Sequence, residues 1–340
     1  MRLPRGVLAW AGVAALALSA CGGGGSSSAS PGTTTLNIAF LPKAVNNPYF
    51  DVAAAGGQEA ATELKGTFKQ VGPSDATGAA QIPFIQTLTS QNVSAIVVSA
   101  DDANAIAPAL KQAMAKGIKV VGYDSSPATD ARNVFINQAD IKGIGEVQIQ
   151  MVCDEIPGCA GEIAVLSATS TATNQNAWID VMKSTLASNP AYSKLKLVKV
   201  AYGNDDPQVS TTEAQGLLTA YPNLKGIISP TTVGIAAAAK VLEDTHKAGK
   251  VALTGLGTPN QMRAFVKDGT CKEFALWNVK DLGYLAYYTA ALLVQGKIKG
   301  TSGETFTAGR LGSYTIDSNT TVLLGKPFVF KADNIDQLNF

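Results

Sequence analysis

Residues 95–124 read AIVVSADDANAIAPALKQAMAKGIKVVGYD and contain the pattern of a strand, a helix and a second strand. The segments AIVVSA and KVVGYD are short runs rich in Val and Ile, which predict β-strands. Between them, AIAPALKQAMAKG has helical spacing, and Gly117 stands where glycine commonly closes a helix. Two strands joined through a helix pair in parallel, so this stretch predicts part of a parallel sheet.

The same alternation continues on both sides of this unit. Further strands are predicted at LNIAFLP, TFKQVGP, NVFINQ, EIAVLSA, KLVKVAYG, GIISP, VALTGLG and EFALWN, with helical patterns between them. Strands that alternate with helices predict an α/β fold in which helices cover both faces of parallel sheets. The pattern restarts near residue 138, after INQAD, so we expect two Rossmann-like lobes.

Composition and motifs favour a binding protein over an enzyme or a nucleic-acid partner. The 340 residues carry 27 basic and 26 acidic side chains, a net charge of +1, which offers nucleic acid no basic patch. There is no Walker loop and no G-x-S-x-G elbow, and the single histidine, His246, lies in a helical pattern where we expect it to be exposed. We therefore expect no catalytic residues, no cofactor and no metal, and a ligand that is neutral or weakly charged.

The N-terminal segment has the features of an export signal. Residues 1–20 carry Arg2 and Arg5 before an apolar run from Val7 to Leu18 that is too short to span a bilayer. The segment LSAC looks like a bacterial lipobox, which implies lipidation of Cys21 and a flexible tether over residues 21–35. The alternative is an ordinary signal peptide with a chance cysteine. We expect the mature protein to be lipid-anchored outside the cytoplasmic membrane, in a periplasm or on that membrane's outer face.

Three further cysteines remain: Cys153, Cys159 and Cys271. The first two flank a Pro-Gly turn in CDEIPGC, and an extracytoplasmic protein can hold a disulfide across such a loop. Three free thiols are the alternative.

Polar and aromatic side chains follow several predicted strands. In a parallel α/β sheet, ligands bind beyond the carboxyl ends of the strands, so these side chains are candidates for a site. The candidates are the charged Lys43 and Asp124, the amides Asn174, Gln175 and Asn278, the aromatic Tyr49, Phe50, Trp178 and Trp277, and Pro230 and Thr232. Amides and charged groups hydrogen-bond hydroxyls while aromatic faces cover apolar ring surfaces, so the set is typical of a site for a small sugar or polyol.

The polar candidates also have structural interpretations. Asp124 could cap the turn after its strand, and Lys43 could be a solvated loop lysine. Asn174 could be the N-cap of QNAWIDVMKSTL.

The same holds for the aromatic candidates. Tyr49 and Phe50 could lie in the buried first turn of a helix that begins at Pro48, and we expect one of them to be a core residue. Trp178 and Trp277 could both be core residues.

These segments resemble a known family. LNIAFLPKAVNNPYF, residues 95–126, VFINQAD, TATNQNAW, AYPNLKGIISPTT, GLGTPNQMRAFVKDGTCKEFALWN and VFKADNIDQLNF together are similar to the ribose-binding-like, type I periplasmic sugar-binding proteins of ABC transporters. The similarity is strongest to the branch that contains the rhamnose-binding proteins and the autoinducer-2 receptor. It implies two Rossmann-like lobes joined by a hinge that the chain crosses three times. It also implies that the aromatic residues of NNPYF pack on a sugar ring.

The resemblance also implies which residues meet the ligand. The matching positions are Lys43, Asp124, Asn174, Gln175, Pro230 and Thr232. The autoinducer-2 receptor has aspartate where this chain has Asn174 and alanine where it has Thr232. Both departures argue against autoinducer-2 as the ligand.

The same comparison implies lobe boundaries and a role. We expect lobe I at 36–137 and 279–310 and lobe II at 138–278 and 311–340, with crossings after Gln138, near Trp277 and near residue 310. The implied role is a monomeric protein that delivers a rhamnose-like deoxysugar, pentose or tetritol to an ABC permease and its ATPase. The alternative is a receptor that presents its ligand, autoinducer-2 or a chemosensory signal, to a membrane sensor.

Overall fold

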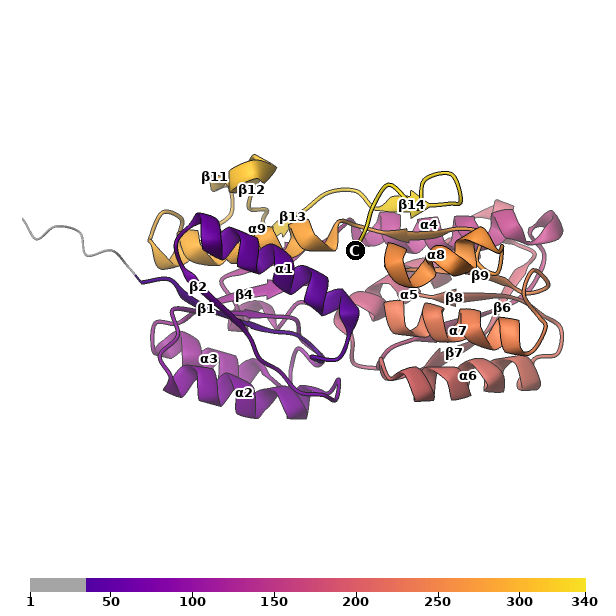
Figure 1. Ribbon diagram of the computed structural model, residues 1–340, viewed down its shortest axis with the longest axis horizontal. Helices are drawn as coiled ribbons and strands as arrows, with labels where there is room; N and C mark the ends of the chain where they lie inside the picture. Colours follow the sequence, from indigo (N-terminus) through magenta and orange to yellow (C-terminus); the bar gives the residue numbers. More distant parts are fainter. Residues whose placement is uncertain (1–34) are drawn as a thin grey trace, which may run out of the picture. The chain divides into compact units, whose positions relative to one another are not determined.

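The computed structural model describes residues 35–340 and contains two parallel sheets, each covered by helices on both faces (Figure 1). This confirms the predicted α/β fold of two Rossmann-like lobes. The predicted signal peptide, Cys21 and nearly all of the tether lie outside the described residues. Within residues 35–340, no helix combines the length and apolar character needed to cross a bilayer.

The first lobe is built on a parallel sheet with the strand order β13-β5-β4-β3-β1-β2. Helices α1 and α9 cover one face of this sheet, and α2 and α3 cover the other (Figure 1). Its elements are β1 (Asn37–Leu41), α1 (Pro48–Glu63), β2 (Thr67–Gln70), α2 (Gly78–Ser90), β3 (Ala95–Val98), α3 (Ala107–Ala115), β4 (Lys119–Tyr123), the 3-10 helix η1 (Thr129–Ala131), β5 (Val134–Asn137), α9 (Val279–Val294) and β13 (Thr321–Leu323).

The second lobe is built on a parallel sheet with the strand order β7-β6-β8-β9. An antiparallel pair, β10 with β14, adjoins β9 through a bridge between Leu256 and Ala275. Its elements are α4 (Ile141–Glu155), η2 (Pro157–Cys159), β6 (Gly161–Ser167), α5 (Thr173–Ser188), η3 (Pro190–Tyr192), β7 (Leu195–Tyr202), α6 (Pro207–Ala220), β8 (Leu224–Ser229), α7 (Thr232–Asp244), β9 (Ala252–Gly255), α8 (Pro259–Lys267), β10 (Phe274–Leu276) and β14 (Phe328–Phe330).

The chain passes from one sheet to the other between β5 and α4 and returns between β10 and α9. The third crossing does not fall near residue 310. After the hairpin of β11 (Thr305–Thr307) and β12 (Ser313–Thr315), β13 pairs in parallel with β5 and so belongs to the first sheet. Arg132 fixes this return, because its guanidinium donates to the backbone oxygens of Asn319 and Thr320 at 3.1 and 3.0 Å. The crossing therefore lies between β13 and β14, and residues 311–323 belong to the first lobe.

Helices α1 and α9 meet through two reciprocal glycines. A methyl group on Gly56 would lie 1.8 Å from the backbone oxygen of Lys280, and one on Gly283 would lie 1.8 Å from that of Ala53. The Gly-Gly pair of AAAGGQEA thus lies inside α1, with Gly56 against α9 and Gly57 against the rings of Phe40 and Phe68 in the sheet.

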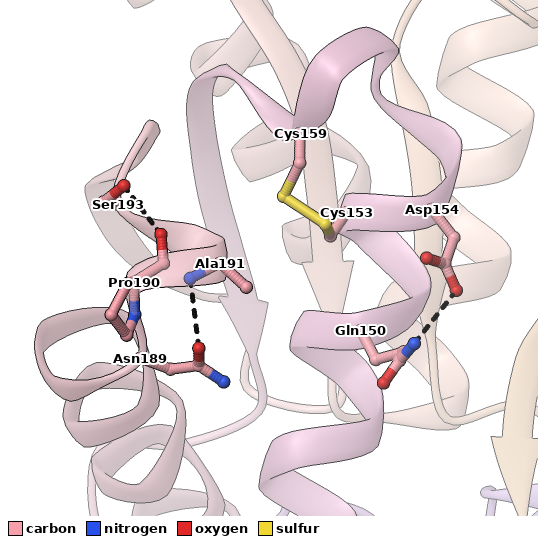
Figure 2. The surroundings of a disulfide bond; sticks show 8 residues. All are labelled: Gln150, Cys153, Asp154, Cys159, Asn189, Pro190, Ala191 and Ser193. Carbon is pink, nitrogen blue, oxygen red and sulfur yellow. Dashed lines mark hydrogen bonds between the residues drawn. A yellow bond between two sulfur atoms is a disulfide. The ribbon is translucent and has the colours of Figure 1, made fainter.

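A disulfide joins Cys153 at the end of α4 to Cys159 in η2, with six residues of sequence separation (Figure 2). The remaining cysteine in the described chain, Cys271, is buried and unbonded. The bond closes the Pro-Gly turn and fixes the connection from α4 into β6. No group of three or more His, Cys, Asp or Glu side chains in residues 35–340 is arranged to hold a metal ion.

Candidate binding site between the two lobes

A cavity of about 350 Å³, measured with its opening to solvent, lies between the lobes. Its walls come from the carboxyl ends of β1, β4, β7, β8, β9 and β10 and from the first turns of α1 and α5. The lining residues are Lys43, Asn47, Tyr49, Phe50, Asp124, Asn174, Gln175, Trp178, Asp205, Pro230, Thr231, Thr232, Leu256, Leu276 and Trp277.

A hydrogen-bonded cluster of three side chains spans the cavity. The Lys43 Nζ lies 3.4 Å from Asp124 Oδ2 and donates to Asn174 Oδ1 at 3.3 Å. The Asn174 Nδ2 donates to Asp124 Oδ1 at 3.2 Å. Lys43 and Asp124 belong to the first lobe and Asn174 to the second, so this cluster connects the lobes. Asn174 is not the N-cap of α5, because the helix begins one residue earlier, at Thr173, and Ala172 occupies the cap position.

Asp124 is held from several sides. Besides Lys43 and Asn174, Tyr49 Oη donates to its Oδ1 at 3.2 Å and Ser99 Oγ donates to its Oδ2 at 2.7 Å. The residue has a φ of +59°, a left-handed conformation that Asp adopts more readily than most residues. This conformation turns the chain at the end of β4, and the carboxylate carries four polar contacts in the cavity wall.

Lys43 is buried, with a side chain that is 4% exposed. Burial by itself lowers the pKa of Lys43, but the negative charges of Asp124, Asp205 and Asp101 outweigh it and raise the pKa above the usual lysine value. Lys43 therefore stays charged at neutral pH, and its ammonium group is a fixed positive charge in the cavity wall.

Aromatic residues form the wall next to this cluster. Trp277 Nε1 donates to Tyr49 Oη at 3.0 Å, and the two rings meet edge to face with centroids 6.1 Å apart. The Trp178 ring lies 5.9 Å from that of Trp277, and its Nε1 has no hydrogen-bond partner in the described chain. Tyr49 and Phe50 are both buried and both line the cavity, so the expectation that only one of them is a core residue was too narrow.

The second lobe supplies the facing wall. Gln175 Oε1 accepts from Ser167 Oγ and from the Ala168 backbone nitrogen, each at 2.8 Å, which orients the side chain. Pro230 and Thr232 lie where β8 passes into α7 and both line the cavity. The topology places Gln175 near Pro230 and Thr232, because the segments that follow β6 and β8 both leave the second sheet at the carboxyl ends of its parallel strands.

Asn278 is the predicted site residue that the structure does not bring to the cavity wall. It is the N-cap of α9, and its Oδ1 accepts from the Asp281 backbone nitrogen at 3.1 Å. An oxygen engaged in a helix cap is poorly placed to bind a ligand as well. We therefore correct the assignment of Asn278 to a capping role.

Asp205 lines the cavity and is missing from the sequence-based set, and Thr231, between the candidates Pro230 and Thr232, lines it as well. Asp205 follows β7 in YGNDDP, a composition that resembles an ordinary turn, and Thr231 Oγ1 donates to its carboxylate. Burial raises the pKa of Asp205, and Asp124 adds to the effect while Lys43 and the bond from Thr231 oppose it. Position after a strand was the signal that could have identified Asp205.

Asp101 lies behind this wall, outside the cavity lining. The residue is 1% exposed, and neither carboxylate oxygen has a hydrogen-bond partner within the described residues. Burial raises the pKa of Asp101 to about 8, although Lys43 acts in the opposite direction.

Two hydrogen bonds that cross the cavity between the lobes are long. The bond from Lys43 Nζ to Asn174 Oδ1 measures 3.3 Å and that from Asn174 Nδ2 to Asp124 Oδ1 measures 3.2 Å, at or beyond the upper end of the usual N–H···O range. A hydroxyl group both donates and accepts, so it can insert between an ammonium and an amide oxygen and satisfy both. The chemistry of this wall suits a small polyhydroxylated molecule that replaces these bonds and lays one apolar face against the aromatic side chains.

Comparison with known proteins agrees with this geometry. A family profile described as a periplasmic binding protein domain matches residues 38–298. The chain is 24% identical over 281 residues to a D-ribose/D-allose-binding protein of Pseudomonas aeruginosa, covering 77% of this chain and 85% of that protein. The profile describes a family of binding proteins, and this relative is named as a binding protein; neither is described as an enzyme.

Two solved structures are more similar in sequence. A solute-binding protein of an ABC transporter from Clostridium phytofermentas, with bound L-rhamnose, is 41% identical with a TM-score of 0.86, over 89% of this chain and 98% of that one. A sugar ABC transporter protein from Actinomyces odontolyticus is 49% identical with a TM-score of 0.71, over 89% of this chain and 97% of that one.

Proposed function

Because the chain belongs to the periplasmic binding protein family, we propose that it captures a small neutral sugar between its lobes and delivers it to an ABC importer. The observation that carries the proposal is the cavity itself, where Lys43, Asp124 and Asn174 face an aromatic wall that includes Tyr49 and Trp277. Binding energy from both lobes is available only when they meet, so the ligand favours the closed arrangement. No bond in the sugar is broken.

Within this class we propose a 6-deoxyhexose of the L-rhamnose type. The structure that is 41% identical holds L-rhamnose. In this chain the cavity lining also includes Leu256, Leu276 and Trp178. A C6 methyl group would contact such apolar side chains, whereas a hydroxymethyl group would lose its hydration there without a hydrogen-bond partner. The polar cluster would meet the ring hydroxyls on the other side.

A binding screen tests this function. We expect L-rhamnose to raise the melting temperature of the purified protein, because a ligand at 100 times its dissociation constant adds about 2.7 kcal/mol of stability. D-Ribose, D-allose, D-arabinose, erythritol and autoinducer-2 form the comparison set. Absence of a shift with every sugar and polyol would contradict sugar capture, whereas a shift with a pentose alone would contradict only the choice of L-rhamnose.

We also propose that Cys21 carries the lipid that holds the protein to the membrane. The support is the LSAC sequence and the Gly- and Ser-rich residues after it. Metabolic labelling with a fatty acid should mark the wild-type protein and not Cys21→Ala, and the variant should leave the membrane fraction. A Cys21→Ala protein that stays membrane-bound would count against the anchor.

A further inference from the structure

A second hollow, which we call the outer groove, adjoins the sugar cavity. It contains about 1260 Å³ of empty space, including its opening to solvent, and both lobes line it. Ser74, Thr77 and Asp102 contribute from the first lobe, and Ser170, Asn204 and Asp206 from the second. Asp205 lines both the groove and the cavity and so belongs to the wall that the two spaces share.

We propose that the outer groove is a second compartment of the sugar site, and that it takes an uncharged, hydroxyl-rich unit attached to the sugar held in the cavity. This proposal rests on the proposed function. The ligand class then includes glycosides and disaccharides, and the bound molecule extends past Asp205 toward solvent.

The chemistry of the groove wall suits hydroxyl groups. Most of its side chains end in hydroxyl, amide or carboxylate oxygens, and an ionised carboxylate makes the stronger hydrogen bonds to a hydroxyl. Asp102 Oδ1 already accepts from the Asn104 and Ala105 backbone nitrogens, and Asp206 Oδ1 accepts from that of Val209. These bonds fix the carboxylates and occupy only one oxygen of each, which leaves the second oxygen to accept from a ligand.

The charge of the groove restricts its occupant. Its lining includes Asp75, Asp102, Asp205 and Asp206 and has no Lys, Arg or His. In the cavity, the single cation Lys43 is paired with Asp124. A phosphate or uronate unit would therefore meet only negative charge in the groove, so we expect neutral units to be accepted and anionic ones rejected.

Contacts in the groove would also contribute to closure. Its walls come from loops at the strand ends of both lobes, so a unit that bridges Asp102 and Asp206 makes all of its contacts only when the lobes meet. No aromatic side chain lines the groove, and we therefore expect the second unit to be held by hydrogen bonds at its edges and not by ring stacking.

Calorimetric titration of the purified protein tests this. The probes are L-rhamnose, methyl α-L-rhamnopyranoside, and L-rhamnose carrying β-D-glucopyranose on O2, O3 or O4. We expect at least one substituted sugar to bind within about threefold of L-rhamnose or more tightly, since a substituent that reaches the groove gains hydrogen bonds to its carboxylates there.

A variant that fills the groove separates its role from that of the cavity. Thr171→Trp places an indole at an exposed groove position and should weaken the accepted derivative by about tenfold or more, while L-rhamnose changes less than about threefold. The control is Thr212→Trp, at an exposed position on α6 outside the groove lining, which should change neither affinity.

The charge argument has its own test. The accepted derivative with glucuronate in place of glucose should bind more weakly than the glucose form. Asp206→Asn, in which the asparagine can still cap α6, should reduce the difference in affinity between the two derivatives.

The outcomes are distinct. L-Rhamnose that binds while all derivatives fail by about a hundredfold or more would overturn the groove proposal and leave the proposed function intact. Thr171→Trp with no effect on an accepted derivative would also overturn it. If neither L-rhamnose nor any derivative bound, both proposals would fail.

Discussion

At Asp124, the backbone conformation and the side-chain contacts lead to the same prediction. Asn also adopts the left-handed conformation that this position requires, so Asp124→Asn removes the charge without straining the turn. Losing a charge-assisted hydrogen bond removes about 1.5 to 3 kcal/mol, so we expect the dissociation constant for L-rhamnose to rise by roughly ten- to a hundredfold in calorimetry. Asp130→Asn is the control, because Asp130 makes an exposed ion pair with Lys111 outside the cavity lining. An unchanged constant in Asp124→Asn would remove Asp124 from the site.

Asp101 predicts a pH dependence of stability. Its pKa of about 8 in the folded chain lies above the ordinary value of 3.8, so the folded state keeps a proton that the unfolded state releases. The stability associated with Asp101 is therefore fully present below about pH 4 and is lost as the pH rises toward 8. Asp101→Asn cannot titrate. The melting temperature of the variant relative to that of wild type should therefore be higher at pH 8 than at pH 5, because wild type loses stability over this interval. Equal differences at both pH values would contradict the buried, proton-bearing carboxyl.

At the scale of the elements, the contact between α1 and α9 predicts that a glycine-to-alanine substitution lowers stability there, whereas the same substitution at an open helix position raises it. Gly283→Ala places a methyl group 1.8 Å from the Ala53 backbone oxygen, and overpacking of this kind destabilises by about 1 to 3 kcal/mol. Gly216 in α6 has no atom within 4 Å of the same added methyl, so Gly216→Ala should stabilise by up to about 1 kcal/mol through helix propensity. Urea unfolding measures both changes. An unchanged free energy of unfolding in Gly283→Ala would contradict this prediction, because it would mean that α1 and α9 can move apart without loss of stability.

The elements also explain what the sequence could predict. Strands β1 to β10 have apolar runs with helical patterns between them, and each was predicted. Strands β11 to β14 have three residues each, too few for any periodicity to be visible, and this is why the third crossing was misplaced. β13 joins the first sheet through its pairing with β5 and through Arg132, a contact between residues 188 positions apart that local pattern cannot reveal.

At the scale of the whole molecule, strand ends predicted most of the cavity wall because parallel topology gathers them at one edge. Lys43, Asp124 and Pro230 were found in this way. Asp205 was missed because Gly, Asn and Asp after β7 have the composition of a plain turn, and only the approach of the two lobes gives it a role. Asn278 is the opposite case: its position after a strand predicts a site residue, but its side chain caps a helix and does not line the cavity.

The approach of the lobes also allows a test that leaves the cavity untouched. Ser125 Oγ and Thr173 Oγ1 are 2.9 Å apart across the lobe boundary, and neither residue lines the cavity. Thr173→Ala removes this bond, usually worth about 0.5 to 1.5 kcal/mol, and so disfavours the closed arrangement without altering a ligand contact. We expect the dissociation constant for L-rhamnose to rise by about two- to tenfold, mainly through faster dissociation in stopped-flow measurements. Thr212→Ala is the matched control, because it removes a hydroxyl that bonds only within α6. An unchanged constant in Thr173→Ala would show that this contact does not contribute to closure. Slower association with unchanged dissociation would contradict the expected kinetics and mean that the contact already forms in the transition state for closure.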